Sequence, residues 1–411
     1  MRRCRMVEVQ RADVDQRKPP RTLGSMRDFD QAGAGMSAVA RGLEGVVAGT
    51  TALSFIDGRA GRLIYRGYDI NDLAQKSTFE EVCYLLWHGR LPTRTELGAL
   101  TAELASMRAL PEGLLGVLRS LPKSLHPLDA LRTVLSPLMA YDEDPEDTSR
   151  EANLRRAKRL TALVSTVVAA FERVRHDADP VAPDPSLHHA ANFLYMLKGQ
   201  PADPLHVRAF DTYLVLLADH GYNASTFTAR VIASTLSDMV SAVAGAIGAL
   251  KGPLHGGAAQ WTMEMLLRIG SVDNVDAYIR GLFDQHKKVP GFGHRIYKVE
   301  DPRAKILRVL SRQVAEKTGG GVWVEMSERV DELVAQLRGD KEIYPNVDFY
   351  SASLLYNIGI PGDLMTPLFA CSRVAGWTAH VIEQQEDNRL FRPQSEYTGP
   401  KEATYIPIDE R

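Results

Sequence analysis

Apolar residues recur at helical spacing along most of this chain. The clearest case begins at Thr78 and Glu81, whose spacing forms a capping box. Apolar positions then follow at i, i+3, i+4, i+7 and i+8 until Gly89 and Pro92 interrupt the pattern. The pattern predicts an amphipathic helix with one face buried in the protein.

The same periodicity predicts helices in most of the remaining sequence, and only one region favours strands. Between residues 43 and 70, β-branched and aromatic residues alternate around the turn sequence DGRAG, which predicts a short extended hairpin. The sum is an all-α fold. The expected helices cover residues 160–173, 204–218, 224–251, 258–269, 302–316, 323–338, 351–358 and 362–385.

The length of 411 residues exceeds the size at which one hydrophobic core keeps growing, so we expect two domains or one large domain with a lobe. Two turns that combine glycine and proline, residues 252–257 and 360–363, are candidate hinges around such a lobe. The first 36 residues mix arginines with acidic residues and lack a continuous apolar core. We expect them to be a disordered extension and not a secretory signal.

The composition excludes several classes of protein. A net charge of −2 leaves no basic excess that would attract nucleic acid or a membrane surface. The longest apolar stretches, residues 160–171 and 239–250, are shorter than the roughly 20 residues that a membrane span needs. Cys4, Cys83 and Cys371 lie far apart, so neither a disulfide framework nor a zinc site is indicated. We therefore expect a cytoplasmic protein without a bound metal.

Two histidines stand among glycines that leave their imidazoles accessible, His255 in GPLHGGA and His294 in PGFGH. His255 precedes the helix expected from residue 258, whose dipole favours a neutral ring, although a structural turn histidine fits the same pattern. Asp348 is a lone carboxylate among aromatic and apolar neighbours, so its pKa should be raised. Together the three side chains form a candidate acid and base set.

Several other polar side chains have two interpretations each. Arg373 lies in an apolar helical stretch and needs a carboxylate, either in a structural ion pair or on a ligand. Lys298, with the backbone of residues 289–293, could hold a nucleotide-like group. His220 either contacts a ligand or is a satisfied core histidine, and Arg392 near the chain end is ambiguous.

Seven motifs, taken in order between residues 42 and 399, resemble those of the citrate synthase family. Each motif alone has modest specificity, but their joint occurrence in this order is not expected by chance. The motifs are YRGYDI at Tyr65, ADHGYNASTF at Ala218, GPLHGGA at Gly252, VPGFGHRIYKVEDPRA at Val289, NVDFYS at Asn346, SRVAGW at Ser372 and RPQSEYTG at Arg392.

The resemblance implies a homodimer with a large helical domain, residues 37–257 with 362–411, and a small mobile domain, residues 258–361, that closes over the substrates. It implies an acyltransferase that condenses acetyl-CoA with oxaloacetate and hydrolyses citryl-CoA, the entry step of the tricarboxylic acid cycle, without a cofactor. The nearest alternative is 2-methylcitrate synthesis from propionyl-CoA, since one methylene is worth only about 1–3 kcal/mol in a pocket. A non-catalytic scaffold that binds CoA thioesters is a remote alternative.

The resemblance also implies a role for each candidate residue. Asp348 would be the base that removes a methyl proton from acetyl-CoA, His255 would donate a hydrogen bond to the thioester oxygen, and His294 would be the acid at the ketone of oxaloacetate. The oxaloacetate ligands would be His220, Arg303, Arg373 and Arg392, with Arg392 supplied by the partner subunit. The CoA-binding residues would be Lys298, Val289, Gly291 and Gly293.

Overall fold

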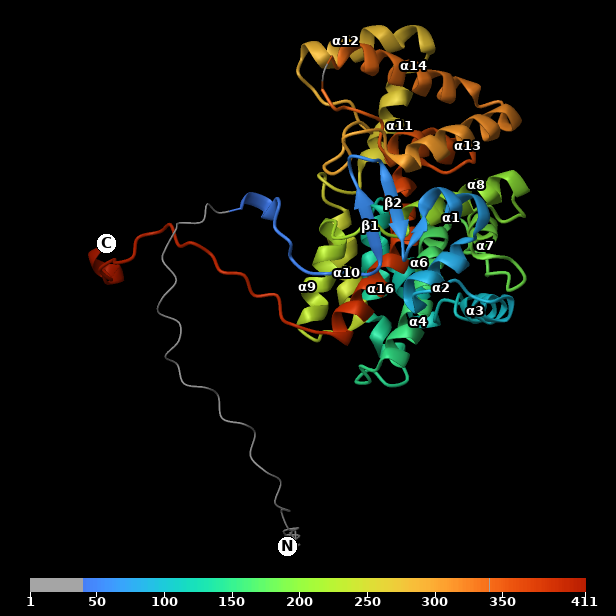
Figure 1. Cartoon of the computed structure of the whole chain (residues 1–411). Coiled ribbons are helices and arrows are strands. Elements are labelled where there is room, and N and C mark those ends of the chain that lie inside the picture. The colour runs from blue at the N-terminus through green and yellow to red at the C-terminus, as the bar shows by residue number, and fades with distance from the viewer. Residues whose placement is uncertain (1–39, 340) are drawn as a thin grey trace, which may run out of the picture. The chain divides into compact units, whose positions relative to one another are not determined.

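The computed structural model describes residues 40–339 and 341–411 of the chain (Figure 1). The expected disordered extension, residues 1–36, lies outside the described residues, as does Cys4. The chain divides into a short unit that ends at Thr50 and a main unit, Thr51–Arg411. In the described part of the short unit the one regular element is the 3₁₀ helix η1 (Arg41–Leu43).

Helices form most of the main unit, which confirms the all-α fold class. Short 3₁₀ helices are η2 (Ser136–Tyr141), η3 (Val272–Asn274), η4 (Gly362–Leu364) and η5 (Ile408–Glu410). The α-helices are α1 (Ile70–Lys76), α2 (Phe79–His88), α3 (Arg94–Ser106), α4 (Glu112–Ser120), α5 (Pro127–Leu135), α6 (Arg150–Arg175), α7 (His189–Lys198), α8 (Pro204–Leu217), α9 (Ala224–Ser234), α10 (Met239–Leu250), α11 (Ala258–Ile269), α12 (Val275–Asp284), α13 (Pro302–Thr318), α14 (Gly321–Leu337), α15 (Val347–Asn357) and α16 (Met365–Glu386).

The expected hairpin is present as a three-stranded antiparallel sheet in the order β1-β2-β3. Strand β1 (Ser54–Asp57) pairs with β2 (Arg62–Tyr65), and β2 pairs with β3 (Tyr68–Asp69). The Asp57 carboxylate accepts hydrogen bonds from the backbone of the two residues that follow Gly58, which closes the turn.

Several predicted helix boundaries were wrong; α6, for example, begins at Arg150 and not at residue 160. Residues 224–251 form two helices, because the chain adopts a left-handed conformation at Leu236 (φ 66°) and restarts where Asp238 caps α10. Helix α15 begins at Val347, earlier than the predicted residue 351, because the Asn346 side chain accepts a hydrogen bond from the backbone of Asp348. The early start places Asp348 in the first turn of the helix.

Helix α16 lies at the centre of the main unit and contacts α2, α5, α6, α8, α9 and α10 (Figure 1). It is buried nearly all round, as expected for a helix with apolar residues on every face. Trp87 of α2 donates its indole hydrogen bond to Thr378 of α16 (3.0 Å), so this core also pairs its polar atoms. Among the described residues, no helix is both long and apolar enough to span a membrane.

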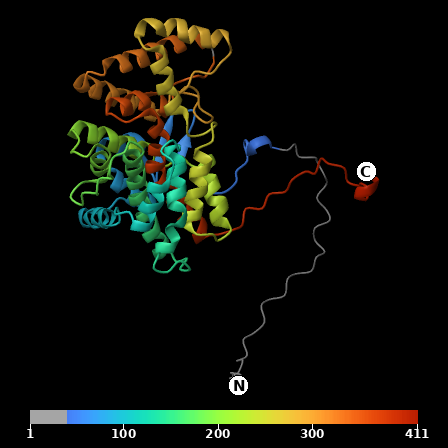
Figure 2. The same cartoon turned by 180° about the vertical axis from the view of Figure 1, so that it is seen from behind.

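Helices α11 to α15 pack mainly on one another: α15 on α11 and α13, and α14 on α12. Both views show them grouped on one side of the main unit, away from α2 to α7 (Figures 1 and 2). Helices α13 and α15 also contact α8, and α13 contacts α1. The candidate histidines His220, His255 and His294 lie in loops, whereas Arg303, Asp348 and Arg373 lie on α13, α15 and α16.

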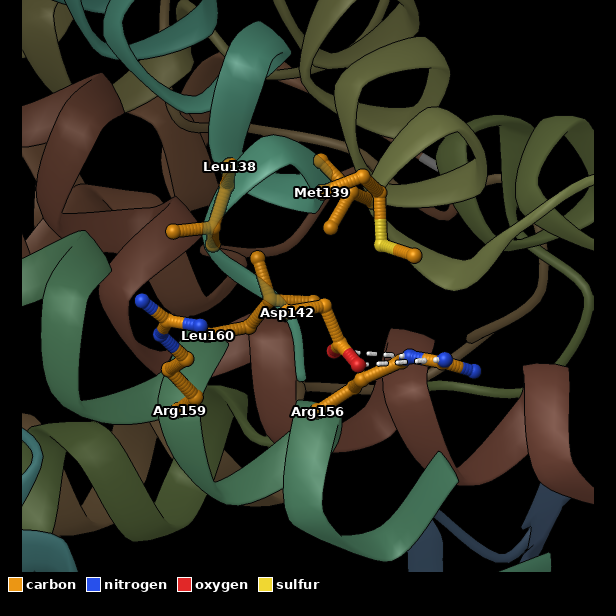
Figure 3. A pocket seen from close by; sticks show the side chains of 7 residues that line it. Leu138, Met139, Asp142, Arg156, Arg159 and Leu160 are labelled. Carbon is orange, nitrogen blue, oxygen red and sulfur yellow. Dashed lines mark hydrogen bonds and ion pairs between the residues drawn. The ribbon is translucent and has the colours of Figure 1, made fainter. Parts of the chain in front are cut away.

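The acidic segment 142–151 starts as a loop and ends at the helix start where Ser149 caps α6. Buried Arg156 holds it by donating to Asp142 (3.0 Å) and to the carbonyl oxygens of Asp144 and Asp147, as Figure 3 shows for the Asp142 pair. The adjoining cavity holds about 10 Å³, room for one water at most, so it is no substrate site.

Candidate active site

Two predicted site histidines from different loops lie edge to edge. His220 follows α8 and His294 precedes α13, and their ring centroids are 5.3 Å apart. Both contact Tyr297, whose hydroxyl lies 3.3 Å from Nε2 of His220 and whose ring centroid lies 4.7 Å from that of His294. The sequence analysis missed Tyr297, although it stands three residues after His294.

The backbone fixes the proton position of His294. Its Nδ1 accepts hydrogen bonds from the backbone N–H groups of Ile296 and Tyr297, each at 3.0 Å. An N–H group can only donate, so the ring carries its proton on Nε2. Burial and the nearby Arg303 lower the pKa of His294 to about 4, which leaves a neutral ring with one free donor.

The two glycines before His294 allow close packing of the loop more than they expose the imidazole to a ligand. A Cβ at Gly291 would lie 2.8 Å from the hydroxyl of Thr262 and 2.9 Å from Phe349, whereas Gly293 has open space where a Cβ would be. Both have positive φ angles, of 77° and 82°. Gly293 also bonds the backbone of Tyr344 (2.8 Å). Gly291 therefore shapes the loop, and only Gly293 presents a free face.

His255 lies in the turn between α10 and α11, and Ser225 holds its ring. Its Nε2 lies 2.8 Å from the Ser225 hydroxyl and accepts from the Ser225 backbone N–H (3.3 Å). Trp377 donates to the same hydroxyl (3.1 Å). Because the backbone N–H must donate, the proton of His255 is on Nδ1. The ring is neutral because burial and Arg373 lower its pKa to about 4, a cause in addition to the helix dipole expected from the sequence.

Asp348 has the raised pKa that its sequence neighbours predicted. Part of the side chain stays accessible, but the surrounding protein removes most of its water, and this burial raises the pKa to about 6. Arg303 and Arg373 oppose the rise by favouring the charged form. The Asp348 carboxyl group is therefore poised to exchange a proton near neutral pH.

The two buried arginines differ in their partners. Arg303 forms a bidentate pair with Asp301, with Nη2 2.7 Å and Nε 3.0 Å from the carboxylate oxygens. Arg373 donates from Nε to the carbonyl of Leu217 (2.6 Å) and stacks on Phe369, but it makes no ion pair with any described carboxylate. The structural ion pair considered for Arg373 is thus absent from residues 40–339 and 341–411. An unpaired buried guanidinium fits a ligand carboxylate.

Comparison with known proteins identifies the family of this chain. The family model "Citrate synthase, C-terminal domain" matches residues 42–394. The chain belongs to the citrate synthase family. It is 53% identical to citrate synthase of Haloferax volcanii over 90% of this chain and 98% of that protein. It is 43% identical to 2-methylcitrate synthase 2 of Corynebacterium glutamicum, over 91% and 98% of the two chains.

Solved structures of the family share the fold. The citrate synthase of Thermoplasma acidophilum, solved in a ternary complex with carboxymethyl coenzyme A and oxaloacetate, matches with a TM-score of 0.87 and 33% identity, over 91% of this chain and 100% of that chain. The citrate synthase of Pyrobaculum aerophilum matches with a TM-score of 0.86 and 41% identity, over 92% and 97% of the two chains.

Within residues 40–339 and 341–411, the remaining candidates of this citrate synthase family member make no hydrogen bond to the three histidines. Lys298 is exposed and lines a cavity of about 470 Å³ together with Arg59, Val299 and Glu342, whereas Val289 is buried. Arg392 lies in the exposed segment after α16 and donates to the carbonyl of Pro393 (2.6 Å). In the part of the chain that the structure describes, Arg392 makes no hydrogen bond to any other candidate site residue. Among the described residues, no group of three His, Cys, Asp or Glu could hold a metal ion.

The hairpin turn touches the loop that carries His294, and this contact gives a first prediction. Lys298 donates its backbone N–H to the carbonyl of Gly58 (2.9 Å), and a Cβ at Gly58 would lie 2.2 Å from the carbonyl oxygen of Ile296. We expect Gly58→Ala to lower the free energy of unfolding by about 1–3 kcal/mol, because two backbones must separate. It should also lower kcat/KM, because the loop of His294 shifts. Denaturant unfolding and steady-state kinetics measure both effects.

The matched control is Gly98→Ala in α3, where a Cβ would meet nothing within 4 Å. Alanine is favoured over glycine in a helix interior, so this variant should keep its activity and gain slight stability. Equal stability and activity for Gly58→Ala and the wild type would show that the hairpin contact is unimportant.

Proposed function

We propose that this protein condenses acetyl-CoA with oxaloacetate and hydrolyses the resulting citryl-CoA to citrate and CoA. The observation that carries the proposal is the arrangement of two neutral imidazoles, His255 and His294, with Asp348. The backbone bonds leave Nδ1–H of His255 and Nε2–H of His294 as donors, while the pKa of Asp348 is raised to about 6. Two fixed donors and one tuned base are what enolisation and attack on a ketone need.

In the condensation, which forms the carbon–carbon bond, Asp348, His255 and His294 each act once. Asp348 removes a proton from the methyl group of acetyl-CoA while His255 donates a hydrogen bond to the thioester oxygen, which becomes the enol oxygen. The methyl carbon then attacks the ketone carbon of oxaloacetate, and His294 gives its Nε2 proton to the ketone oxygen. Water finally attacks the thioester carbon of citryl-CoA, and the CoA thiol leaves with a proton.

Oxaloacetate carries two carboxylates, and the proposed site supplies cations and donors for them. Arg373 forms no ion pair with a carboxylate of the described residues, and His220 lies against His294. Arg303 keeps Nη1 free of its pair with Asp301. We assign these three residues, with Arg392 of a second copy, to oxaloacetate binding.

A homodimer would bring Arg392 to this site. The segment after α16 exposes several large apolar side chains that a second copy could cover, as expected for an interface. They are Leu390, Tyr397, Tyr405, Ile406 and Ile408, with exposed fractions from 48% to 80%.

We further propose that residues 258–361 form a small domain that closes over the substrates. Each flanking turn contains glycine. A Cβ at Gly256 in the first turn would lie 2.4 Å from the carbonyl of Leu250, whereas a Cβ at Gly362 in the second would meet nothing within 4 Å. Lys298 and the free face of Gly293 are proposed to contact CoA, while Val289 and Gly291 maintain the conformation of the loop.

Buried Cys83 and Cys371, which form no disulfide, suit a reducing compartment. We therefore place this tricarboxylic acid cycle activity in the cytoplasm, and we propose that it needs no cofactor.

Product analysis tests the function directly. We expect purified protein to release free CoA from acetyl-CoA only when oxaloacetate is present, with citrate as the second product by mass spectrometry. The 2-methylcitrate synthases among its relatives make propionyl-CoA the necessary comparison, and its kcat/KM should be lower. A higher kcat/KM for propionyl-CoA would favour 2-methylcitrate synthesis. Binding of acetyl-CoA without turnover would favour a scaffold.

A further inference from the structure

One face of α16 runs along the chain segment that carries His220. Arg373 donates to the carbonyl of Leu217, and a Cβ at Gly376 would lie only 2.3 Å from the carbonyl oxygen of Ala218. His380 follows Gly376 by four residues and therefore lies on the same face. The helix and the backbone next to His220 are thus in direct contact over two turns.

Asp219, the residue before His220, is fully buried and ionised. Its carboxylate accepts hydrogen bonds from the Ser54 hydroxyl, from the backbone N–H of Gly221 (3.2 Å) and from Nε2 of His380 (3.1 Å). Burial would raise the pKa of Asp219, but His380 and Arg373 hold it at about 2. This carboxylate therefore ties the hairpin, the His220 loop and α16 together.

The other side of His380 determines where its proton lies. Nδ1 of His380 is 3.0 Å from Nη1 of Arg230, and a guanidinium can only donate. Nδ1 is therefore the acceptor, and Nε2 carries the proton that is donated to Asp219. Arg230 also bonds Glu383 (2.6 Å), whose other oxygen accepts from the backbone of Ala52 (2.8 Å). Carboxylate, imidazole, guanidinium and carboxylate form one continuous chain.

We propose that His380 is a positioning residue for the oxaloacetate site, which it orders through Asp219 and thereby through the backbone of His220. His380 itself touches none of the proposed catalytic side chains. Its bond to Asp219 restricts the backbone from Ala218 to Gly221 and so the direction of the His220 ring. Hydrogen bonds to charged groups in a buried network are strong, so losing this one loosens the loop. The inference rests on the proposed role of His220 as an oxaloacetate ligand.

Two substitutions of His380 separate its two hydrogen bonds. His380→Gln can keep an N–H donor near the position of Nε2, whereas His380→Asn is too short to reach Asp219 and can keep only an acceptor for Arg230. We expect His380→Asn to raise KM for oxaloacetate about tenfold or more, as for loss of a charged hydrogen bond. KM for acetyl-CoA should change little, and His380→Gln should recover most of the loss.

The matched control is His189→Asn. His189 is a buried histidine of the same unit whose Nε2 lies 2.8 Å from the Ser165 hydroxyl, with no contact to the His220 loop. It should lose comparable thermal stability and keep the wild-type KM for oxaloacetate. The proposal is overturned if His380→Asn retains the wild-type KM, if glutamine and asparagine are equally impaired, or if the control shows the same rise.

Two further measurements keep the test decisive. Should His380→Asn fail to fold, Glu383→Gln replaces it, because Glu383 lies at the other end of this hydrogen-bonded series. It should also raise KM for oxaloacetate, by a smaller factor, and an unchanged KM would overturn the proposal. Calorimetric binding of oxaloacetate to the wild type separates the two levels of inference. If the wild type does not bind oxaloacetate, the proposed function is contradicted. If the wild type binds it and the His380 variants keep the wild-type KM, only the role of His380 is contradicted.

Discussion

Asp348→Asn should lower kcat by about 10³-fold, within the range of 10²- to 10⁴-fold that a positioned general base contributes. The amide cannot take a proton from the methyl group of acetyl-CoA, while the two histidines remain in place. Release of CoA in the presence of oxaloacetate measures the loss. Because the pKa of Asp348 is about 6, wild-type kcat/KM should also fall as the pH drops below about 6, where the base becomes protonated.

Stability should change in the opposite direction to activity. The folded-state pKa of about 6 lies above the ordinary 3.8, so the stabilising contribution of the protonated form is lost as the pH rises through 6. Above that pH the buried charge is a cost, and Asp348→Asn removes it. The variant should melt at or above the wild-type temperature at pH 7, with the difference vanishing near pH 4.

The control for this pair of effects is Asp331→Asn. Asp331 also has a pKa raised by burial, but its carboxylate accepts from the hydroxyl of Tyr350 (2.7 Å), away from the proposed reacting atoms. Its kcat should stay close to that of the wild type. A kcat for Asp348→Asn within a few-fold of the wild type would remove Asp348 as the base.

The second large effect is recovery of activity in a mixed dimer. Asp348→Asn and Arg392→Ala subunits should each form nearly inactive homodimers, one lacking the base and the other lacking an oxaloacetate ligand. When both are produced in one cell with separable tags, the mixed dimer should be active. If Arg392 reaches across, one site combines an intact Asp348 with Arg392 of the other subunit, and the second site carries both defects.

The size of the recovery distinguishes the two arrangements. Random pairing gives half mixed dimers with one intact site of two, so the unseparated mixture should show roughly a quarter of wild-type activity. An Arg392 that served its own subunit would give no recovery above the mean of the two inactive parents. Mixing two separately tagged wild-type subunits controls for the effect of the tags, and a purified mixed dimer should reach about half of the wild-type activity.

Local sequence patterns determined much of the fold and the nature of the candidate site. The capping box of Thr78 and Glu81, the hairpin around DGRAG and the start of α11 at Ala258 each depend on neighbours a few residues apart. The raised pKa of Asp348 followed from its apolar surroundings in the chain. The break between α9 and α10 was missed because the apolar pattern continues across it, as both helices face α16.

Only the tertiary structure decided how the site is held. Ser225, Tyr297, Asp219 and His380 acquire their meaning from contacts between side chains up to about 160 residues apart, such as the 3.1 Å bond between His380 and Asp219. That Arg373 forms no ion pair with any described carboxylate is likewise a property of packing. Sequence periodicity reports which face of a helix is buried, but the proton positions of the histidines depend on which donor faces each ring nitrogen, and that is decided when the helices pack.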